Sequence, residues 1–218
     1  MDIVIAGAHH MEMDPLREKL QKQGYQTSDD RNVYRIPEGV GHILRVIETG
    51  IGLEKSEHQL SSALGRLTEL PDLLINFGTC GGIHPDSALG DLILVTATVS
   101  EEGEIPLESG EDTYADLLGR YLKKSDIPYR TGPVYSTEKA ITDEVARDEI
   151  YRTSGALAVN MESYSLAKVC SNRKLPMVSI KYVSDNADEF ALKDFMANLD
   201  EAAQRLGDLA VGYLDSLN

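Results

Sequence analysis

Apolar runs rich in β-forming residues alternate along this chain with segments of helical periodicity. The runs include DIVIAG at 2–7, DLLINFG at 72–78 and MVSIKYVS at 177–184. Between them, apolar residues spaced three and four apart mark one face of a helix, as over 60–67 and again over 114–122. Strands that are apolar without interruption are buried on both faces, which requires helices on each side of the sheet. The alternation therefore predicts an α/β, three-layer fold with a mixed, mostly parallel central sheet flanked by helices.

The length and the distribution of residues favour a single domain spanning 1–218. With 42% hydrophobic content, the 218 residues can bury one sizeable core, and the chain has no internal repeat, linker or low-complexity segment. No apolar run approaches the roughly 18 residues that would cross a bilayer. The amino terminus, MDIVIAGAHH, has neither the positive region nor the long apolar stretch of an export signal. We therefore expect a soluble, cytoplasmic protein.

The charge of the chain argues against two classes of partner. It carries 36 acidic and 21 basic residues, a formal net charge of −15, which repels phosphate backbones and anionic lipid surfaces. We expect no nucleic acid and no membrane partner, and a small neutral or zwitterionic ligand instead. The two cysteines, Cys80 and Cys170, cannot build a disulfide framework and are predicted to be reduced thiols.

Proline and glycine set several expected boundaries. Asp14 and Pro15 indicate the cap and the first residue of a helix that stops at Gly24. The run YRTGPVYS at 129–136 is expected to be a strand near an edge of the sheet, because Pro133 cannot donate to a strand ladder.

Two longer segments are assigned as a loop and as the last helix. The acidic stretch SEEGEIPLESGED at 100–112 is expected to be a loop. A long closing helix is predicted to turn its apolar residues towards the core, namely Phe195, Leu199, Leu206, Leu209, Tyr213 and Leu214.

The stretch NFGTCGGI at 76–83 has the G-x-C-x-G spacing of a nucleophile elbow. Such an elbow needs a helix directly after the turn and a histidine later in the chain. Proline and glycine follow here, and no histidine occurs after His84. Cys80 is therefore interpreted as a small buried thiol. The glycines at 78, 81 and 82 indicate a ligand site more strongly than Cys80 does, because a backbone without side chains lets a ligand approach closely.

Carboxylates and glycine turns recur where the predicted strands end. Glu12 follows the first strand, Gly50-Ile51-Gly52 follows the strand over 42–49, Glu162 follows ALAV, and Asp185 follows the run at 177–184. The carboxyl ends of parallel strands meet at one edge of a sheet, where ligands bind. Each acid alone could equally be a solvated residue or a helix cap. Together they predict a site with three carboxylates.

Five segments, in this order, resemble a known family. They are IAGAHHMEMDPLREKL, TGIG, INFGTCGGI, AVNMESYSLAKVC and VSDNAD, and they extend over nearly the whole chain. They resemble the nucleosidase branch of the nucleoside phosphorylase superfamily, most of all the methylthioadenosine/adenosylhomocysteine nucleosidases. The resemblance implies hydrolysis of the N-glycosidic bond of an adenine nucleoside to free base and sugar. It also implies a homodimer, with no cofactor.

The resemblance assigns catalytic roles to two acids. Glu12 would be the general base that activates water, and Asp185 the general acid that protonates N7 of the departing purine. Ser184 would orient the carboxyl of Asp185. Glu162 would accept hydrogen bonds from the ribose hydroxyls, and Met161 would pack its thioether against the sugar.

Three further residues are expected at the substrate. Thr79 occupies the small hydroxyl position of the glycine turn, where it would hold either Asp185 or the water network. Ile51 lies in the turn beside the sugar, and Ile141 is expected to offer backbone contacts to the base.

The chain departs from the family pattern at several positions. Lys181 replaces the usual arginine four residues before the aspartate, which keeps the charge but loses the bidentate geometry. Asn160 replaces an acid, and Lys139 or Ala140 stands where an aromatic residue would stack on adenine. The loop that covers the 5′ substituent is shortened. The sequence therefore supports recognition of the base better than recognition of the 5′ group.

Three other functions remain open from the sequence. A phosphorylase would use Arg17 of DPLR as a phosphate ligand, although Asn76 stands where phosphorylases place a second cation. A purine-binding protein without efficient chemistry would keep the same fold. Hydrolysis of 6-oxopurine nucleosides, including the futalosine type, would suit an amide better than Asp185. His9 and His10 beside Glu12 resemble a metal cluster, but adjacent residues of a strand point apart, so no metal is expected.

Overall fold

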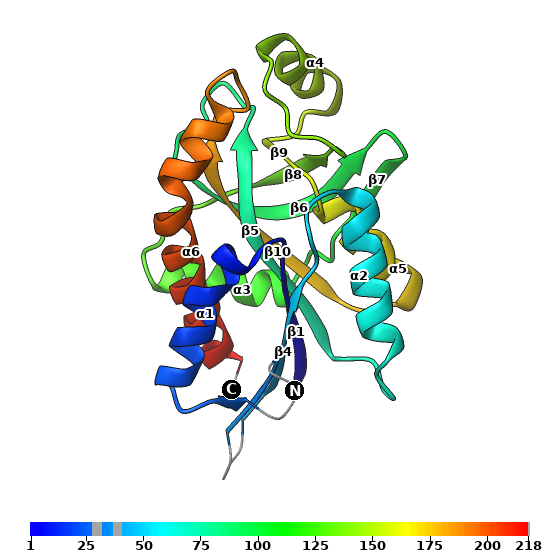
Figure 1. The fold of residues 1–218 in the computed structure, drawn as a ribbon, viewed down its shortest axis with the longest axis vertical. Coiled ribbons are helices and arrows are strands. Elements are labelled where there is room, and N and C mark those ends of the chain that lie inside the picture. The colour runs from blue at the N-terminus through cyan, green and yellow to red at the C-terminus, as the bar shows by residue number, and fades with distance from the viewer. Residues whose placement is uncertain (28–31, 37–40, 218) are drawn as a thin grey trace.

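The computed structural model describes residues 1–27, 32–36 and 41–217 (Figure 1). The strands of this part of the chain are β1 (Asp2–Gly7), β2 (Gln26–Thr27), β3 (Val33–Arg35), β4 (Ile43–Glu48), β5 (Leu73–Gly82), β6 (Leu92–Ser100), β7 (Gly103–Pro106), β8 (Arg130–Ser136), β9 (Ala158–Asn160) and β10 (Met177–Asp185). The helices are α1 (His10–Lys22), α2 (Leu53–Gly65), α3 (Tyr114–Lys124), α4 (Glu144–Ser154), α5 (Ser163–Arg173) and α6 (Ala191–Ser216).

The strands form one mixed sheet that closes on itself along part of its width. β5 pairs in parallel with β1 and with β10, and β1 continues through β4, β3 and β2 as an open sheet. On the other side, β10 pairs with β6, β6 with β8, β8 with β9, and β9 returns to β5. The α/β class and the mixed sheet are confirmed. The barrel-like closure was not predicted, because local sequence carries no signal for which strands pair.

Helices cover both faces of this sheet (Figure 1). Ile3 and Ile5 of β1 belong to the core cluster that contains residues of α1, α3 and α6. Val4 and Ala6, the alternate residues of the same strand, belong to the cluster with residues of α2 and α5. Because successive strand residues point to opposite faces, a continuously apolar strand joins both clusters.

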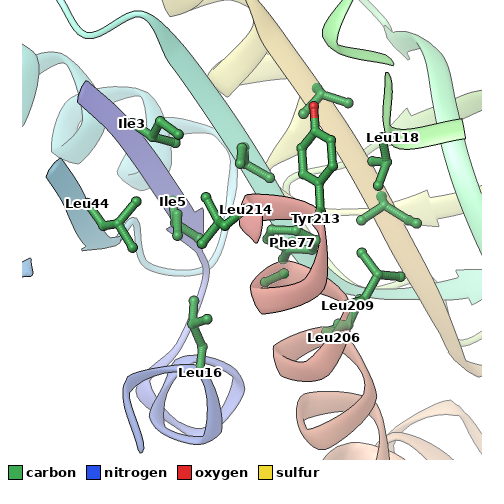
Figure 2. Close-up of a cluster of buried hydrophobic side chains, with 14 of the residues drawn as sticks. Ile3, Ile5, Leu16, Leu44, Phe77, Leu118, Leu206, Leu209, Tyr213 and Leu214 are labelled. Atoms are coloured by element: carbon green, nitrogen blue, oxygen red, sulfur yellow. The ribbon is translucent and has the colours of Figure 1, made fainter. Parts of the chain in front are cut away.

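The larger part of the core lies between the open sheet and α6. Figure 2 shows leucines of α6 meeting β-strand and α1 side chains there. Tyr213 is fully buried and donates its hydroxyl to the carbonyl of Tyr114, 2.8 Å away. The expected closing helix is therefore confirmed as α6, although Phe195, near its start, is only partly buried.

Helix α1 begins four residues before the predicted cap. His9 is its N-cap, and Nδ1 of His9 accepts from the amide of Met11 at 3.3 Å. Glu12 reaches back to the amide of His9 at 3.3 Å, which completes a capping box. The expected start at Asp14 and Pro15 is therefore wrong, because this reciprocal capping starts the helix earlier and leaves the proline inside it.

Strand β8 lies inside the sheet, where an edge strand was expected. It pairs with both β6 and β9. Pro133 is tolerated because the register with β6 shifts between Val95 and Thr98, so no ladder bond needs its missing N–H. The carbonyl of Pro133 still accepts from the amide of Leu157 at 2.9 Å.

Three elements were not predicted from the sequence, the first of which is the two-residue strand β2. The acidic segment expected as a loop contains β7, which pairs antiparallel with β6. Helix α4, the third, has no fully buried residue, although Ile150 and Tyr151 pack against a small core cluster. In the described ranges, no helix is both long and apolar enough to span a bilayer.

Candidate active site

A cavity of about 510 Å³ opens at the carboxyl edge of the sheet. Residues that end β5 and β10 or directly follow β1, β4 and β9 contribute to its lining, as expected for ligand sites in such sheets. All eight residues singled out from the sequence line it, namely Glu12, Ile51, Thr79, Ile141, Met161, Glu162, Ser184 and Asp185. The fold thus brings together segments that are more than 170 residues apart.

The carboxyl group of Glu12 accepts four hydrogen bonds, three from backbone amides and one from a hydroxyl. Its Oε2 accepts from the amides of Ala8 at 3.1 Å and His9 at 3.3 Å. Its Oε1 accepts from the amide and the hydroxyl of Thr79, both at 2.9 Å. Because every amide donor needs an acceptor, this environment suits an ionised carboxylate. The same capping box that starts α1 therefore orients the proposed base.

Asp185 ends β10 with its carboxyl group partly buried. Its Oδ2 accepts from the hydroxyl of Ser184 at 2.8 Å, and its Oδ1 accepts from the amide of Ala187 at 3.0 Å. Burial raises the pKa of Asp185 despite these two donors. Gly81 is required beside it, because a Cβ there would lie 2.7 Å from Oδ1 of Asp185.

Glu162 precedes α5 and is 8% exposed. Its Oε1 accepts from the amide of Gly52 at 3.4 Å, and its Oε2 from the amide of Met161 at 3.3 Å. Burial raises the pKa of Glu162 to about 7, while the positive charge of Lys181 opposes the rise. This carboxyl group therefore changes protonation near neutral pH.

Lys181 is a fully buried cation close to two of the acids. Burial lowers its pKa, and the charges of Glu162 and Glu12 counter that effect. A Cβ at Gly78 would lie 3.3 Å from Nζ of Lys181 and 3.5 Å from Oε1 of Glu12. Gly78 and Gly81, which lie within strand β5 and not in the expected turn, thus make room for the protein's own charged side chains, whereas that space was expected to serve a ligand.

One wall of the cavity is apolar and was not recognised from the sequence. It includes Leu192, Phe195 and Met196 of α6 and Met11 of α1. Phe195 was expected in the core but lines the cavity, because a helical apolar stripe looks the same whether it faces a core or a cavity. Leu199, also expected in the core, is buried at 3% exposure and borders the cavity as well. Leu192 and Met196 are exposed at 71% and 56%.

The loop between β8 and α4 forms another part of the lining, through Thr137, Ala140, Ile141 and Thr142. Lys139, the other residue considered in place of a stacking aromatic, is exposed and not among the lining residues. His9 lines the cavity as well.

Asn160, which stands where an acid was expected before Met161, belongs to a buried polar network. Oδ1 of Asn160 accepts from the hydroxyl of Ser136 at 2.6 Å, and Nδ2 of Asn160 donates to the hydroxyl of Ser163. Ser163 in turn donates to Oδ1 of Asn76 at 3.1 Å. Asn160 and Asn76, two positions where the chain departs from related patterns, are therefore joined through one serine.

Three residues considered for other chemistry are buried or paired within the protein. Cys80 is buried, and burial raises the pKa of its thiol, so it stays protonated and does not act as a nucleophile. Arg17 pairs with Asp14 at 2.9 Å and Glu48 at 2.8 Å and does not line the cavity. Asn76 is 2% exposed and donates to the carbonyl of Ala6.

The described residues of the cavity include neither lysine nor arginine among its lining side chains. Over the same described ranges, no group of three or more His, Cys, Asp or Glu side chains is arranged to hold a metal ion. The chemistry that the lining offers is that of three carboxyl groups and the imidazole of His9 beside hydroxyls, amides and apolar surface.

Comparison with known proteins places this arrangement among enzymes of nucleoside chemistry. A family model described as the phosphorylase superfamily matches residues 2–215. The 5′-methylthioadenosine/S-adenosylhomocysteine nucleosidase of Buchnera aphidicola is 26% identical, and the match covers 100% of this chain and 99% of that protein.

Two solved structures are similar over almost their whole length. One is a putative 5′-methylthioadenosine/S-adenosylhomocysteine nucleosidase from Francisella philomiragia, with 26% identity, a TM-score of 0.81 and 98% of each chain covered. The other is a Helicobacter pylori nucleosidase mutant with 5′-methylthioadenosine in its active site, with 21% identity, a TM-score of 0.85 and 98% of each chain covered. At 21% identity, the second comparison bears on the fold alone.

Proposed function

This chain belongs to the phosphorylase superfamily, and on that premise we propose that it is a nucleosidase. It hydrolyses the N-glycosidic bond of an adenine nucleoside, of the methylthioadenosine/adenosylhomocysteine type, to free base and sugar. The observation that carries the proposal is the convergence of Glu12, Glu162 and Asp185 on one cavity whose described lining has no lysine or arginine. Three carboxyl groups match the needs of a reaction that passes through a cationic sugar.

Asp185 acts on the departing base. Its raised pKa favours the neutral carboxyl group, which donates a proton to N7 of the purine while the bond from C1′ to N9 breaks. The hydroxyl of Ser184 holds the carboxyl group in one orientation. Because Asp185 donates as a neutral acid and accepts from an amino group when ionised, it favours a 6-aminopurine over a 6-oxopurine.

Glu12 acts on the water. A water molecule in the cavity donates a hydrogen bond to its Oε1, the oxygen that also accepts from the Thr79 hydroxyl. As the water oxygen bonds to C1′, Glu12 accepts the proton that the water loses. The backbone donors from Ala8 and His9 hold the carboxylate during this step.

Glu162, Met161 and Ile51 bind the sugar. In its ionised form, Glu162 accepts hydrogen bonds from two ribose hydroxyls, and its negative charge stabilises the positive charge that develops on the ring. Met161 and Ile51 supply apolar contact at the sugar. Ile141, in the loop after β8, lies against the base.

Hydrolysis accounts for the site better than phosphorolysis does. A phosphate dianion needs cationic or amide donors, and charge-assisted hydrogen bonds to such an ion contribute roughly 1.5–3 kcal/mol each. Arg17, the candidate phosphate ligand, is paired with two acids outside the cavity. Water, a small neutral nucleophile, needs only the Glu12 carboxylate.

The assembly and location of the protein follow from the same family. We propose a homodimer of three-layer, single-domain subunits spanning 1–218, acting in the cytoplasm. Exposed apolar side chains near the mouth of the cavity, including Ile51 at 52% and Leu192 at 71%, support burial by a second copy. The free cysteines, both buried, are consistent with a reducing compartment.

The test is chromatographic detection of free base from a panel of nucleosides, each with and without phosphate. The panel includes methylthioadenosine, adenosylhomocysteine, adenosine, inosine and a pyrimidine nucleoside. We expect adenine and free sugar at a rate independent of phosphate. Release only with phosphate, giving sugar 1-phosphate, would make the protein a phosphorylase. Tight binding without release of base would make it a binding protein, and preference for inosine would contradict the role given to Asp185.

A further inference from the structure

Glu138 lies in the loop between β8 and α4, which also carries Ala140, Ile141 and Thr142 of the cavity lining. We propose that Glu138 is a positioning residue, which holds this loop against the Gly50–Gly52 turn and so sets the spacing between the base side and the sugar side of the cavity. The kinetic part of its test rests on the nucleosidase function proposed above. The structural part does not.

Glu138 supplies a helix cap from a distant part of the chain. Its Oε2 accepts from the amides of Leu53 at 2.8 Å and Glu54 at 3.3 Å, which begin α2. The first amides of a helix have no partner within it, and Gly52, the N-cap, has no side chain to offer. The negative charge of Glu138 is also favoured at this positive end of the helix. The bond therefore has a clear physical basis, although 85 residues separate Leu53 from Glu138.

The backbone of the turn is shaped around this carboxylate. Gly52 has φ of 100°, in the region that favours glycine. A Cβ at Gly52 would lie 2.7 Å from Oε1 of Glu138, closer than a Cβ atom approaches an atom to which it is not bonded. Glycine is therefore needed at this position both for its conformation and for the contact.

The loop has few other attachments. At its start, the amide of Thr137 donates to the carbonyl of Asn160 at 2.9 Å. At its end, Asp143 caps α4 by accepting from the amide of Ala146 at 2.9 Å. Within the part of the chain that the structure describes, the hydrogen bonds that tie residues 138–142 to another element are those of Glu138. Loss of this carboxylate leaves the stretch without a hydrogen bond to another element, and the packing of Ile141 against the small cluster that contains Ile83 and Val159 is then its main remaining contact.

The two sides of the cavity meet at the start of α2. The amide of Gly52 donates to Glu162, on the sugar side, and the next two amides donate to Glu138, on the base side. Ile51, in the same turn, lines the cavity. Any shift of the loop relative to α2 therefore changes the distance between the surfaces that contact the base and the ribose.

The kinetic test compares Glu138→Ala with Glu138→Gln. Alanine removes the acceptor, so we expect KM for methylthioadenosine to rise about 10-fold, a loss of about 1.4 kcal/mol, with kcat changed less than about threefold. Glutamine keeps an acceptor oxygen and loses the charge, so its KM should lie between those of alanine and wild type. Thr113→Ala is the matched control, because Thr113 caps α3 through the amide of Asp116 and does not line the cavity.

The structural test measures amide hydrogen exchange and backbone order by NMR without any nucleoside. In Glu138→Ala, the amides of Leu53 and Glu54 should exchange faster than in wild type, and the ¹⁵N heteronuclear NOE of residues 139–142 should fall. An unchanged heteronuclear NOE at 139–142, or a wild-type KM in a variant that still hydrolyses nucleosides, would overturn the positioning role. If wild type hydrolyses no nucleoside, the proposed function fails, and the heteronuclear NOE at 139–142 alone decides the role of Glu138.

Discussion

At the scale of single residues, the proposed mechanism depends on two carboxyl groups with different environments. Glu12 receives four hydrogen bonds, whereas burial raises the pKa of Asp185. Such a pair allows one group to accept a proton while the other donates one. Neither role is visible in the residue type, since both groups are ordinary acids in the sequence.

The first prediction concerns removal of either group. Glu12→Gln and Asp185→Asn should each lower kcat for methylthioadenosine by at least about 100-fold, the usual effect of losing a general base or acid. Both amides nearly match the acids in shape, so the far-ultraviolet circular dichroism and the unfolding temperature should stay close to wild type. A variant with near-normal kcat would remove that residue from the mechanism.

The second prediction concerns Lys181 and the pH dependence of the reaction. Burial raises the pKa of Glu162 to about 7, and the charge of Lys181 holds it from rising further. Because the ionised form of Glu162 is the one that binds the ribose hydroxyls, kcat/KM should fall as the pH falls through about 7. Lys181→Met removes the opposing charge, so the pKa of Glu162 rises. The acid limb of the plot of kcat/KM against pH should therefore move to higher pH.

The control for this experiment is Lys181→Arg, which keeps the positive charge. Its acid limb should stay nearer to that of wild type. The groups whose charges act on Lys181 are Glu162, Glu12 and Cys80, and the Cys80 thiol stays protonated because burial raises its pKa. An identical acid limb in wild type and Lys181→Met would show that the lysine does not control the protonation of Glu162.

At the scale of elements, the site depends on how helices start and how they pack. The cap of α1 orients Glu12, and the start of α2 holds both Glu162 and Glu138. α6 contributes to the cavity through its first turns and to the core through its later ones. Packing of α6 on α1 and on the sheet therefore supports the position of the apolar wall (Figure 2).

The third prediction tests this packing. Leu206 is 3% exposed in the core cluster shared by α1, α6 and the sheet. Leu206→Ala should lower the free energy of unfolding by about 2–5 kcal/mol, through lost burial and the cavity left behind. Urea unfolding measures the loss. Val145→Ala on α4, where the side chain is 77% exposed, should change the same quantity by less than about 0.5 kcal/mol. Equal effects of the two substitutions would contradict the assigned packing.

At the scale of the whole molecule, exposed apolar side chains indicate how subunits assemble. Large apolar side chains are exposed on α6 and just before it, at Phe190, Leu192 and Met196. Leu192 and Met196 line the mouth of the cavity, so a second copy seated there would also complete the site.

The fourth prediction is that sedimentation equilibrium gives a mass about twice the 23.9 kDa of one chain. Because apolar burial drives such association, the dimer should persist at high salt. A mass of one chain at all concentrations would contradict the homodimer and leave the exposed residues of α6 without a partner.

The sequence predicted the α/β class, five of the six helices in the described ranges and eight of the residues that line the cavity. The class and the helices depend on local patterns, namely the apolar period and the positions of glycine and proline. The three cavity acids and the turn of Ile51 stood out at strand ends, whereas Thr79, Ile141, Met161 and Ser184 were assigned through the family resemblance. Where two local signals competed, the prediction failed. Pro15 indicated a helix start, but the capping box of His9 and Glu12 starts α1 earlier, and Pro133 indicated an edge, but a register shift admits it inside the sheet.

Only the tertiary structure decided which strands pair and which apolar stripes face a cavity. The ring through β5, β10, β6, β8 and β9 and the cavity wall from α6 depend on contacts between residues far apart in the chain. The same holds for Glu138, an exposed acid in the sequence that caps a helix 85 residues away. Local sequence determines which conformations a segment favours, whereas the choice of distant partner depends on the packing of the whole chain.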